Sequence, residues 1–169
     1  MEFLGITNKL LNKQRNLENQ YLDYINYCLP KLQYEQHYSN AGSGISFFAS
    51  FNDDVFGYGF LLDILINQFR YKGIIPNKKI QLDRCYTNLY PYKNSGDWHS
   101  DDDHPNAKTI LFYPQIWEPD WEGGTSFSSN PTIEYKQNAA VLFNGNILHK
   151  ADYHTNPNHR YTIAYKIKI

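Results

Sequence analysis

The sequence predicts a mainly β protein whose N-terminal part is helical, with a helical layer packed against a double-sheet β core. Apolar residues recur at helical spacing early in the chain, whereas period-two alternation and closely spaced turn residues dominate the later part. With 169 residues, of which 41% are hydrophobic, the chain is long enough to bury one substantial core. We expect a single domain over residues 1–169, with mostly helical support in 1–78 and the β core in 79–169.

Two helices are expected in the first part. The first has one apolar stripe that ends near Pro30. Its members are Leu17, Tyr21, Tyr24, Ile25, Cys28 and Leu29. The second covers residues 60–69, which is long for a buried strand, and Gly73 and Pro76 close it. Between them, residues 37–46 have the Ser, Asn and Gly content of a loop.

From residue 79 onward, short strands follow one another between turn signals. In the first of them, period two places Arg84, Asn88 and Tyr90 on one face. We expect strands at 80–90, 109–113, 125–128, 132–135, 139–143 and 161–169. Many short strands at close spacing indicate a sandwich or a barrel.

Composition limits the classes of partner and compartment. A net charge of -1 gives no general attraction to nucleic acid or to an anionic membrane, so both are disfavoured as partners. No apolar run is long enough to span a bilayer, and no secretory segment follows Met1. Cys28 and Cys85 make no disulfide framework and are interpreted as free thiols. These features predict a cytoplasmic protein, in a host cytoplasm if the source is a virus.

His99 and Asp101 are the first candidate metal ligands. On a strand, residues two apart point to the same side, so both side chains can reach one ion. The neighbouring carboxylates of Asp102 and Asp103 leave the register of this motif open. A third ligand has to come from elsewhere in the chain.

Three histidines can supply that ligand: His149, His154 and His159. His149 is favoured because the apolar run 139–143 leads to it through a tight Asn-Gly-Asn turn, whereas the other two lie in polar sequence. Two histidines and one carboxylate on one face leave coordination positions open. This set suits Fe(II) chemistry with O2 and a chelating co-substrate better than a closed zinc site.

Arg160 and Thr162 form a candidate anion anchor. Both lie on one face of the last predicted strand, with Arg160 eleven residues after His149. A guanidinium beside a hydroxyl can hold the far carboxylate of a dicarboxylate through charge-assisted, bidentate hydrogen bonds.

This ordered set of motifs resembles the Fe(II)/2-oxoglutarate-dependent dioxygenase superfamily and, more closely, its prolyl 4-hydroxylase-like branch with short microbial and phage members. The resemblance covers about residues 80–169 and includes the Gly-Gly segment 122–127, to which it gives an architectural role. It implies a double-stranded β-helix (jelly-roll) fold. By resemblance, His99, Asp101 and His149 would be the iron ligands, and Arg160 with Thr162 would bind the C5 carboxylate of 2-oxoglutarate. Tyr113 would support that carboxylate, and Tyr90 would line the pocket.

The resemblance also implies an activity. The expected cofactors are Fe(II), 2-oxoglutarate as co-substrate and O2, with ascorbate as a candidate accessory reductant. The expected reaction is hydroxylation of a substrate C–H, first of all of a peptidyl proline, so a peptide or small protein is the expected partner. Asp101 argues against halogenation, because halogenating relatives lack a carboxylate at that position. The alternatives are a free amino acid, small metabolite or nucleobase as substrate, or a non-catalytic metal-binding jelly-roll.

Further residues are weaker candidates for the substrate pocket. Aromatic side chains near the metal motif could stack on a pyrrolidine ring, or could be packing residues. These are Tyr90, Tyr92, Trp98 and Trp117. Arg84 and Asn88 share the face of Tyr90, and the segment 39–46 is a candidate lid.

Overall fold

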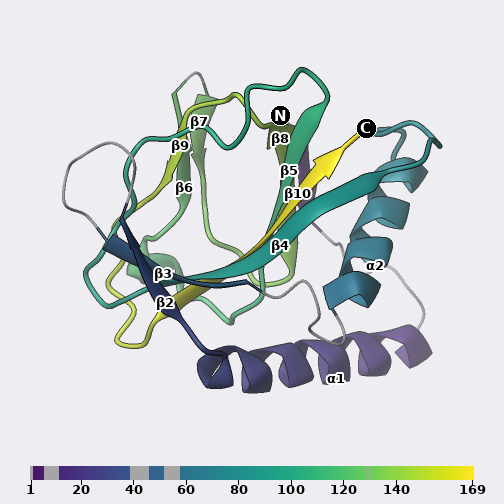
Figure 1. Cartoon of the computed structure of the whole chain (residues 1–169). Coiled ribbons are helices and arrows are strands. Elements are labelled where there is room, and N and C mark those ends of the chain that lie inside the picture. The colour runs from purple at the N-terminus through teal and green to yellow at the C-terminus, as the bar shows by residue number, and fades with distance from the viewer. Residues whose placement is uncertain (1, 6–11, 39–45, 52–57, 129) are drawn as a thin grey trace.

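The computed structural model describes residues 2–5, 12–38, 46–51, 58–128 and 130–169. Within these ranges, antiparallel strands form two sheets that face each other (Figure 1). The large sheet has the order β1-β8-β5-β10-β4-β3-β2, and the small sheet has the order β7-β6-β9. The strands of the large sheet are β1 (Glu2–Gly5), β2 (Glu35–Tyr38), β3 (Ser46–Phe51), β4 (Gln81–Tyr90), β5 (Ala107–Tyr113), β8 (Ala139–Asn144) and β10 (Arg160–Lys168). Those of the small sheet are β6 (Thr125–Phe127), β7 (Asn130–Ile133) and β9 (His149–Ala151).

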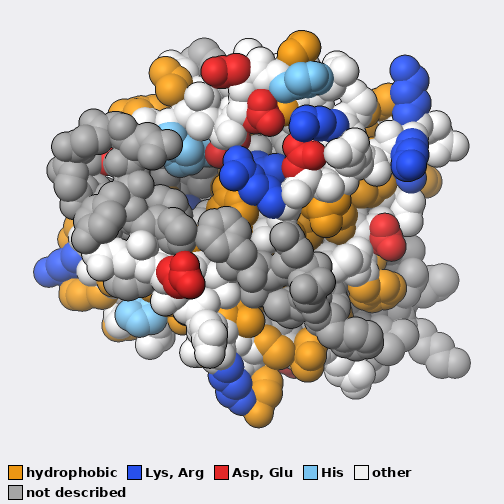
Figure 2. All heavy atoms as spheres, in the orientation of Figure 1, with side chains coloured by type: hydrophobic (Ala, Val, Ile, Leu, Met, Phe, Trp, Pro, Cys, Tyr) orange, Lys and Arg blue, Asp and Glu red, His pale blue; other side chains and the backbone are white. Residues whose placement is uncertain are grey.

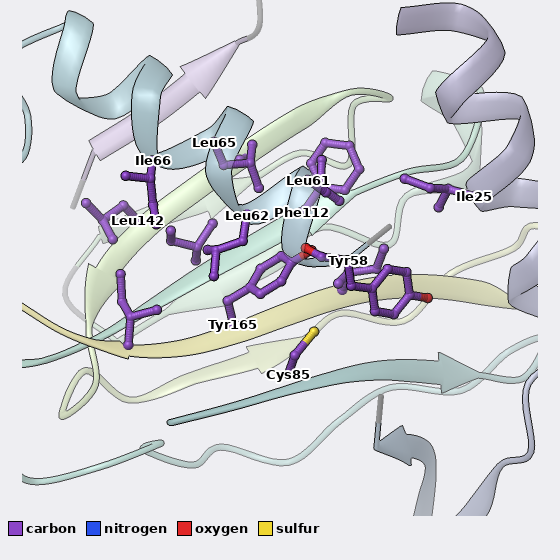
Figure 3. Close-up of a cluster of buried hydrophobic side chains, with 14 of the residues drawn as sticks. Ile25, Tyr58, Leu61, Leu62, Leu65, Ile66, Cys85, Phe112, Leu142 and Tyr165 are labelled. Atoms are coloured by element: carbon purple, nitrogen blue, oxygen red, sulfur yellow. The ribbon is translucent and has the colours of Figure 1, made fainter. Parts of the chain in front are cut away.

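Two helices cover the outer face of the large sheet. They are α1 (Asn12–Cys28) and α2 (Tyr58–Tyr71), and short 3-10 turns follow at Leu29–Lys31 and Pro119–Trp121. Figure 3 shows side chains of α2 pointing at Phe112, Leu142 and Tyr165 of the sheet. Burying each aliphatic side chain of this interface stabilises the fold by about 1.5–3 kcal/mol before entropy is counted. No helix in the described ranges is both long and apolar enough to cross a membrane.

Helix α2 ends where the sequence indicates. Gly73 has a φ of 69°, the left-handed conformation that glycine adopts without a Cβ penalty. The amides of Gly73 and Ile74 donate to the carbonyls of Arg70 and Phe69, at 2.9 Å each, and so satisfy two of the last free carbonyls of the helix.

Strand β10 separates two cores. Alternate residues on one face, Ile163 and Tyr165 among them, pack against the helices. On the other face, Ala164 joins the second core, which fills the space between the sheets with Val141, Phe143 and other side chains. This inner face also carries Arg160, Thr162 and Lys166, all buried. The space between the sheets is therefore apolar in part and polar in part, and the polar part holds the candidate site.

The predicted fold class is confirmed: the protein is mainly β, with two helices against a double-sheet core. Four strands were not predicted, β1, β2, β3 and β9, each of three to six residues. Strands this short carry little periodicity, and β1 is held by pairing with β8, a partner distant in sequence. The large sheet therefore draws strands from both sides of residue 79.

Two local predictions differ from the structure. The expected loop 37–46 includes the end of β2 and the start of β3, and its central residues 39–45 lie outside the described ranges, as does most of the predicted lid. In α1, Tyr24 is 46% exposed, and Leu22 is buried beside Ile25 and Leu29. The prediction that Tyr24 belongs to the apolar stripe was therefore wrong. A tyrosine has an apolar ring and a polar hydroxyl, so it can lie on the buried or on the exposed face of a helix.

The surface in the orientation of Figure 1 mixes charged, polar and apolar side chains (Figure 2). Lysine and arginine side chains lie beside aspartate and glutamate side chains on this face, so no single sign of charge dominates it. This agrees with the near-neutral net charge of the sequence.

Candidate metal centre

The backbone brings the His99 motif and β9 together. His99 and His149 form a β-bridge in which each amide donates to the carbonyl of the other residue, at 3.0 and 2.9 Å. The Asp101 amide donates to the carbonyl of Gly145, at 2.8 Å. A Cβ at Gly145 would lie 2.9 Å from the carbonyl oxygen of Asp102, so this turn requires glycine. The Asn-Gly-Asn turn thus fixes the His-x-Asp segment as well as His149.

Both imidazole rings are oriented by their own loop. Nδ1 of His99 lies 2.8 Å from the carbonyl oxygen of Asp97, and Nδ1 of His149 lies 2.9 Å from that of Ile147. Because a carbonyl only accepts, each Nδ1 carries a proton, which leaves Nε2 as the nitrogen through which each ring can bind a metal. This is how metal-binding histidines are usually held, with the second ring nitrogen bonded to a carbonyl or carboxylate.

The three predicted ligands converge. Nε2 of His99 lies 3.6 Å from Oδ1 of Asp101, and Nε2 of His149 lies 3.6 Å from Oδ2. Ligand atoms about 2.0–2.2 Å from one ion are at most ~4.4 Å apart, and these separations meet that requirement. All three residues offer ligand atoms within 4.8 Å of one another. The donor set, two imidazoles and one carboxylate on one face, fits a divalent ion with open positions.

Lys166 and Thr109 hold Asp101, and neither was predicted. The Lys166 ammonium forms a short ion pair with Oδ2 of Asp101, and the Thr109 hydroxyl donates to the same oxygen at 2.6 Å. Lys166 also donates to Thr109 Oγ1, at 3.1 Å. The alternating pattern of 161–169 indicates on which face of the strand Lys166 lies, but not which residue it contacts. Its ion pair depends on a loop some sixty residues away in sequence, so no local signal indicated it.

Burial and the neighbouring charges shift two pKa values at the centre. Burial alone would raise the pKa of Asp101, but Lys166 and His149, with the hydrogen bonds, lower it to about 2. Burial lowers the pKa of His149 to about 4, against the opposing effect of Asp101. At neutral pH, Asp101 is thus ionised and His149 is neutral, which are the states that bind a metal ion.

Arg160 is buried at the other end of the inner face. Its Nε donates to the carbonyl of Gly123 at 2.7 Å, and its Nη2 donates to the carbonyl of Gly124 at 3.0 Å and to Thr125 Oγ1 at 3.3 Å. The guanidinium lies over the Tyr90 ring, with Cζ 5.2 Å from its centroid. A buried cation without an ionic partner among the described residues is suited to receive an anion.

The Gly-Gly segment that binds this arginine is closely packed. Gly123 has a φ of 78°, and a Cβ there would lie 2.7 Å from Cβ of His154 and 2.8 Å from the Trp117 ring. A Cβ at Gly124 would lie 2.5 Å from the carbonyl oxygen of Ile133. Only glycines allow the chain to pass here and to direct two carbonyls at Arg160, which agrees with the architectural role given to this segment.

The remaining anchor candidates lie around Arg160. The Tyr113 hydroxyl donates to Thr125 Oγ1 at 2.9 Å, the oxygen that Arg160 also reaches. Thr162 Oγ1 accepts from Nδ2 of Asn88, at 3.4 Å. Burial raises the pKa of Tyr90 to about 12, so this residue keeps its phenolic proton. Their roles toward a co-substrate stay a prediction.

Other predicted pocket residues are spread over different environments. Trp117 stacks on Tyr135 with ring centroids 4.2 Å apart, Trp98 is 44% exposed under Lys150, and Tyr92 is 49% exposed. Arg84 is exposed at the far end of β4. His154 is buried, but its Nε2 lies against the carbonyl of Tyr90, at 3.2 Å, and it is not among the converging ligands.

A separate hollow of about 720 Å³ opens on the outer face of the small sheet. Ser126 and Asp152, which line it, are joined by a 2.9 Å hydrogen bond. Thr125 and Phe127 alternate with Ser126 and are buried, so the hollow and His149 lie on opposite faces of this sheet.

Comparison with known proteins identifies the fold. No family model and no curated protein matches the sequence. A 2OG-Fe(II) oxygenase family oxidoreductase from Burkholderia pseudomallei aligns with a TM-score of 0.64 and 12% identity, over 87% of this chain and 78% of that one. The viral collagen prolyl hydroxylase of Paramecium bursaria Chlorella virus-1, solved with 2-oxoglutarate, gives 0.59 and 15%, over 89% and 90%. HygX from Streptomyces hygroscopicus, with nickel, 2-oxoglutarate and hygromycin B bound, gives 0.63 and 11%, over 94% and 87%.

The protein is therefore a helix-supported double-stranded β-helix with a His-Asp-His cluster between its two sheets. Its fold is that of the 2-oxoglutarate- and Fe(II)-dependent oxygenases, as the sequence resemblance implied.

Proposed function

We propose that this protein is an Fe(II)- and 2-oxoglutarate-dependent dioxygenase that hydroxylates a substrate C–H. The observation that carries the proposal is the placement of His99, Asp101 and His149 as converging ligands on the same inner surface that buries Arg160. One group of residues can hold a divalent ion, and the other can hold an anion. A co-substrate that chelates the metal ion and is also a dicarboxylate needs both groups of residues.

Each side chain has a distinct role in this proposal. His99, Asp101 and His149 bind Fe(II), and Arg160 binds the C5 carboxylate of 2-oxoglutarate, with Thr162 and Tyr113 beside it. Tyr90 stacks under the guanidinium and keeps it in place. The iron with 2-oxoglutarate and O2 supplies the oxidising power, and 2-oxoglutarate leaves as succinate and CO2. The chain supplies the binding geometry and a partly desolvated setting.

For the substrate, we favour a proline in a peptide or small protein. Two observations support this: the sequence motifs resemble the prolyl 4-hydroxylase-like branch, and a viral collagen prolyl hydroxylase shares the fold. A small metabolite is the second candidate, because HygX has the same fold and was solved with hygromycin B bound. One scaffold hosts many substrates, so the choice between them needs an experiment.

The first experiment measures succinate release by the full-length protein with Fe(II), 2-oxoglutarate, O2 and ascorbate. Proline-containing peptides, free amino acids, nucleosides and an aminoglycoside are added in parallel, and mass spectrometry follows the products. A gain of one oxygen on proline supports the peptide substrate, and a gain on another compound replaces it. If Fe(II) and 2-oxoglutarate bind but no succinate forms under any condition, the non-catalytic metal-binding jelly-roll is the better description.

A further inference from the structure

The buried ion pair between Lys166 and Asp101 has a consequence for the metal site. The side chains of Lys166 and Asp101 are 8% and 4% exposed, so solvent screens their interaction little. Thr109 completes a closed triangle, because its hydroxyl donates to Asp101 and accepts from Lys166. Burial of two charges costs free energy, which this ion pair and its hydrogen bonds offset.

The position of Lys166 is fixed by its strand. It lies between Thr109 of β5 and Arg84 of β4, its direct partners in the ladder. Its side chain points to the inner face, as do those of Arg160 and Thr162, and its ammonium lies 5.4 Å from the centroid of the Tyr86 ring. A lysine held from both neighbouring strands directs its charge at one carboxylate and is not a loose surface cation.

Both hydrogen-bond donors reach the same oxygen of Asp101. Lys166 and Thr109 contact Oδ2, which also lies 3.6 Å from Nε2 of His149. Oδ1 lies 3.6 Å from Nε2 of His99 and receives neither of these two donors. This arrangement fixes the rotation of the carboxylate and leaves Oδ1 free to bind as a single ligand atom. The same ammonium neutralises the only carboxylate of the ligand set. A divalent ion at this site would share that carboxylate with a cation already in contact with it.

We infer that Lys166 is a positioning residue that fixes Asp101 for binding through Oδ1 and that weakens divalent-metal binding by its charge. The inference rests on the metal site of the proposed function. A solely structural lysine would stabilise the fold without opposing the metal, so the sign of the effect on metal affinity separates the two roles.

The test is calorimetric titration of the metal-free, full-length protein with Mn(II). Lys166→Met removes the charge and the donors, Lys166→Gln keeps a donor without charge, and Lys166→Arg keeps the charge. The two neutral variants should bind Mn(II) at least tenfold more tightly than the wild type, and Lys166→Arg within threefold of it. Thr109→Val removes a hydrogen bond but no charge, and its affinity should stay equal or fall.

Thermal unfolding gives a second readout. The neutral variants should melt at a lower temperature than the wild type without metal, and saturating Mn(II) should raise their melting temperature by more. Equal or weaker Mn(II) binding in both neutral variants overturns the inference. If the wild type itself binds no divalent metal, the metal site fails, and with it the proposed function; a wild type that binds Mn(II) leaves that function standing whatever the Lys166 variants do.

Discussion

His99 and His149 are joined through their backbones by two hydrogen bonds, of 3.0 and 2.9 Å. This bridge connects the loop after β4 to the start of β9 and sets the two imidazole rings 4.4 Å apart, centroid to centroid. Backbone hydrogen bonds therefore set the positions of the two rings, so substituting a side chain of the cluster should leave the backbone in place. This makes the ligand set testable by substitution.

The first prediction concerns which aspartate binds the metal. Asp101→Asn should weaken Mn(II) binding by more than the ~10–100-fold that loss of a hydrogen bond to a ligand costs. Asp102→Asn is the matched control, because its carboxylate accepts from the His104 amide and is not among the converging ligands. Calorimetric titration measures both. Equal losses in the two variants would show that the ligand register is wrong.

The second prediction concerns the co-substrate. Arg160→Met keeps much of the buried volume but removes the guanidinium, and should weaken 2-oxoglutarate binding to the Mn(II)-loaded protein by ~2–5 kcal/mol. Mn(II) binding should change little, since Arg160 is not a ligand. Lys150→Met removes a positive charge from the outer face of the small sheet and should leave both affinities unchanged. Unaltered 2-oxoglutarate binding by Arg160→Met would rule out this anchor.

The third prediction concerns the Gly-Gly segment. Gly123→Ala should lower the free energy of unfolding by ~1–3 kcal/mol, because its φ is positive and its new Cβ meets His154 and Trp117. Gly59→Ala is the control: it lies in α2, where an added Cβ would meet no described atom within 4 Å apart from its own helix backbone, and should leave stability equal or higher by up to ~1 kcal/mol. Urea unfolding of the metal-free protein compares them. Equal stability of the two variants would contradict the close packing around Gly123.

The fourth prediction concerns acid stability of the metal-free protein. The pKa of His149 is lowered from 6.5 to about 4, so as the pH falls below 6.5 the unfolded chain takes up a proton that the folded chain does not. Between pH 7 and pH 5 this should remove about 2 kcal/mol of stability. Below pH 4 the ionised Asp101, whose folded pKa is about 2, adds to the loss.

Urea unfolding at pH 7 and pH 5 checks this prediction. His149→Gln should flatten the pH dependence over that interval, and the exposed His104→Gln should keep it. A wild-type and a His149→Gln protein with the same loss of stability between the two pH values would show that His149 is not the group responsible.

Much of the candidate site could be predicted from the sequence, because its signals are local. His99 and Asp101 were expected to share one side of a strand; the structure brings both to one site, but from a loop in which His99 forms an isolated β-bridge. The apolar strand before His149 sets that residue on a rigid element. Period two put Arg160 and Thr162 on one face of the last strand, and the structure buries both there.

Pairing between distant segments decided the rest. Alternation gives the side of β10 on which Lys166 lies, but the tertiary structure alone brings Asp101 to it. Likewise, the sequence gives no sign that the carbonyls of Gly123 and Gly124 accept hydrogen bonds from Arg160, because these contacts form only when the two sheets pack together. The short strand β1 exists because β8 offers it hydrogen bonds. Periodicity along a chain reports which residues share a face, whereas contacts between faces depend on how the sheets pack, which no local pattern encodes.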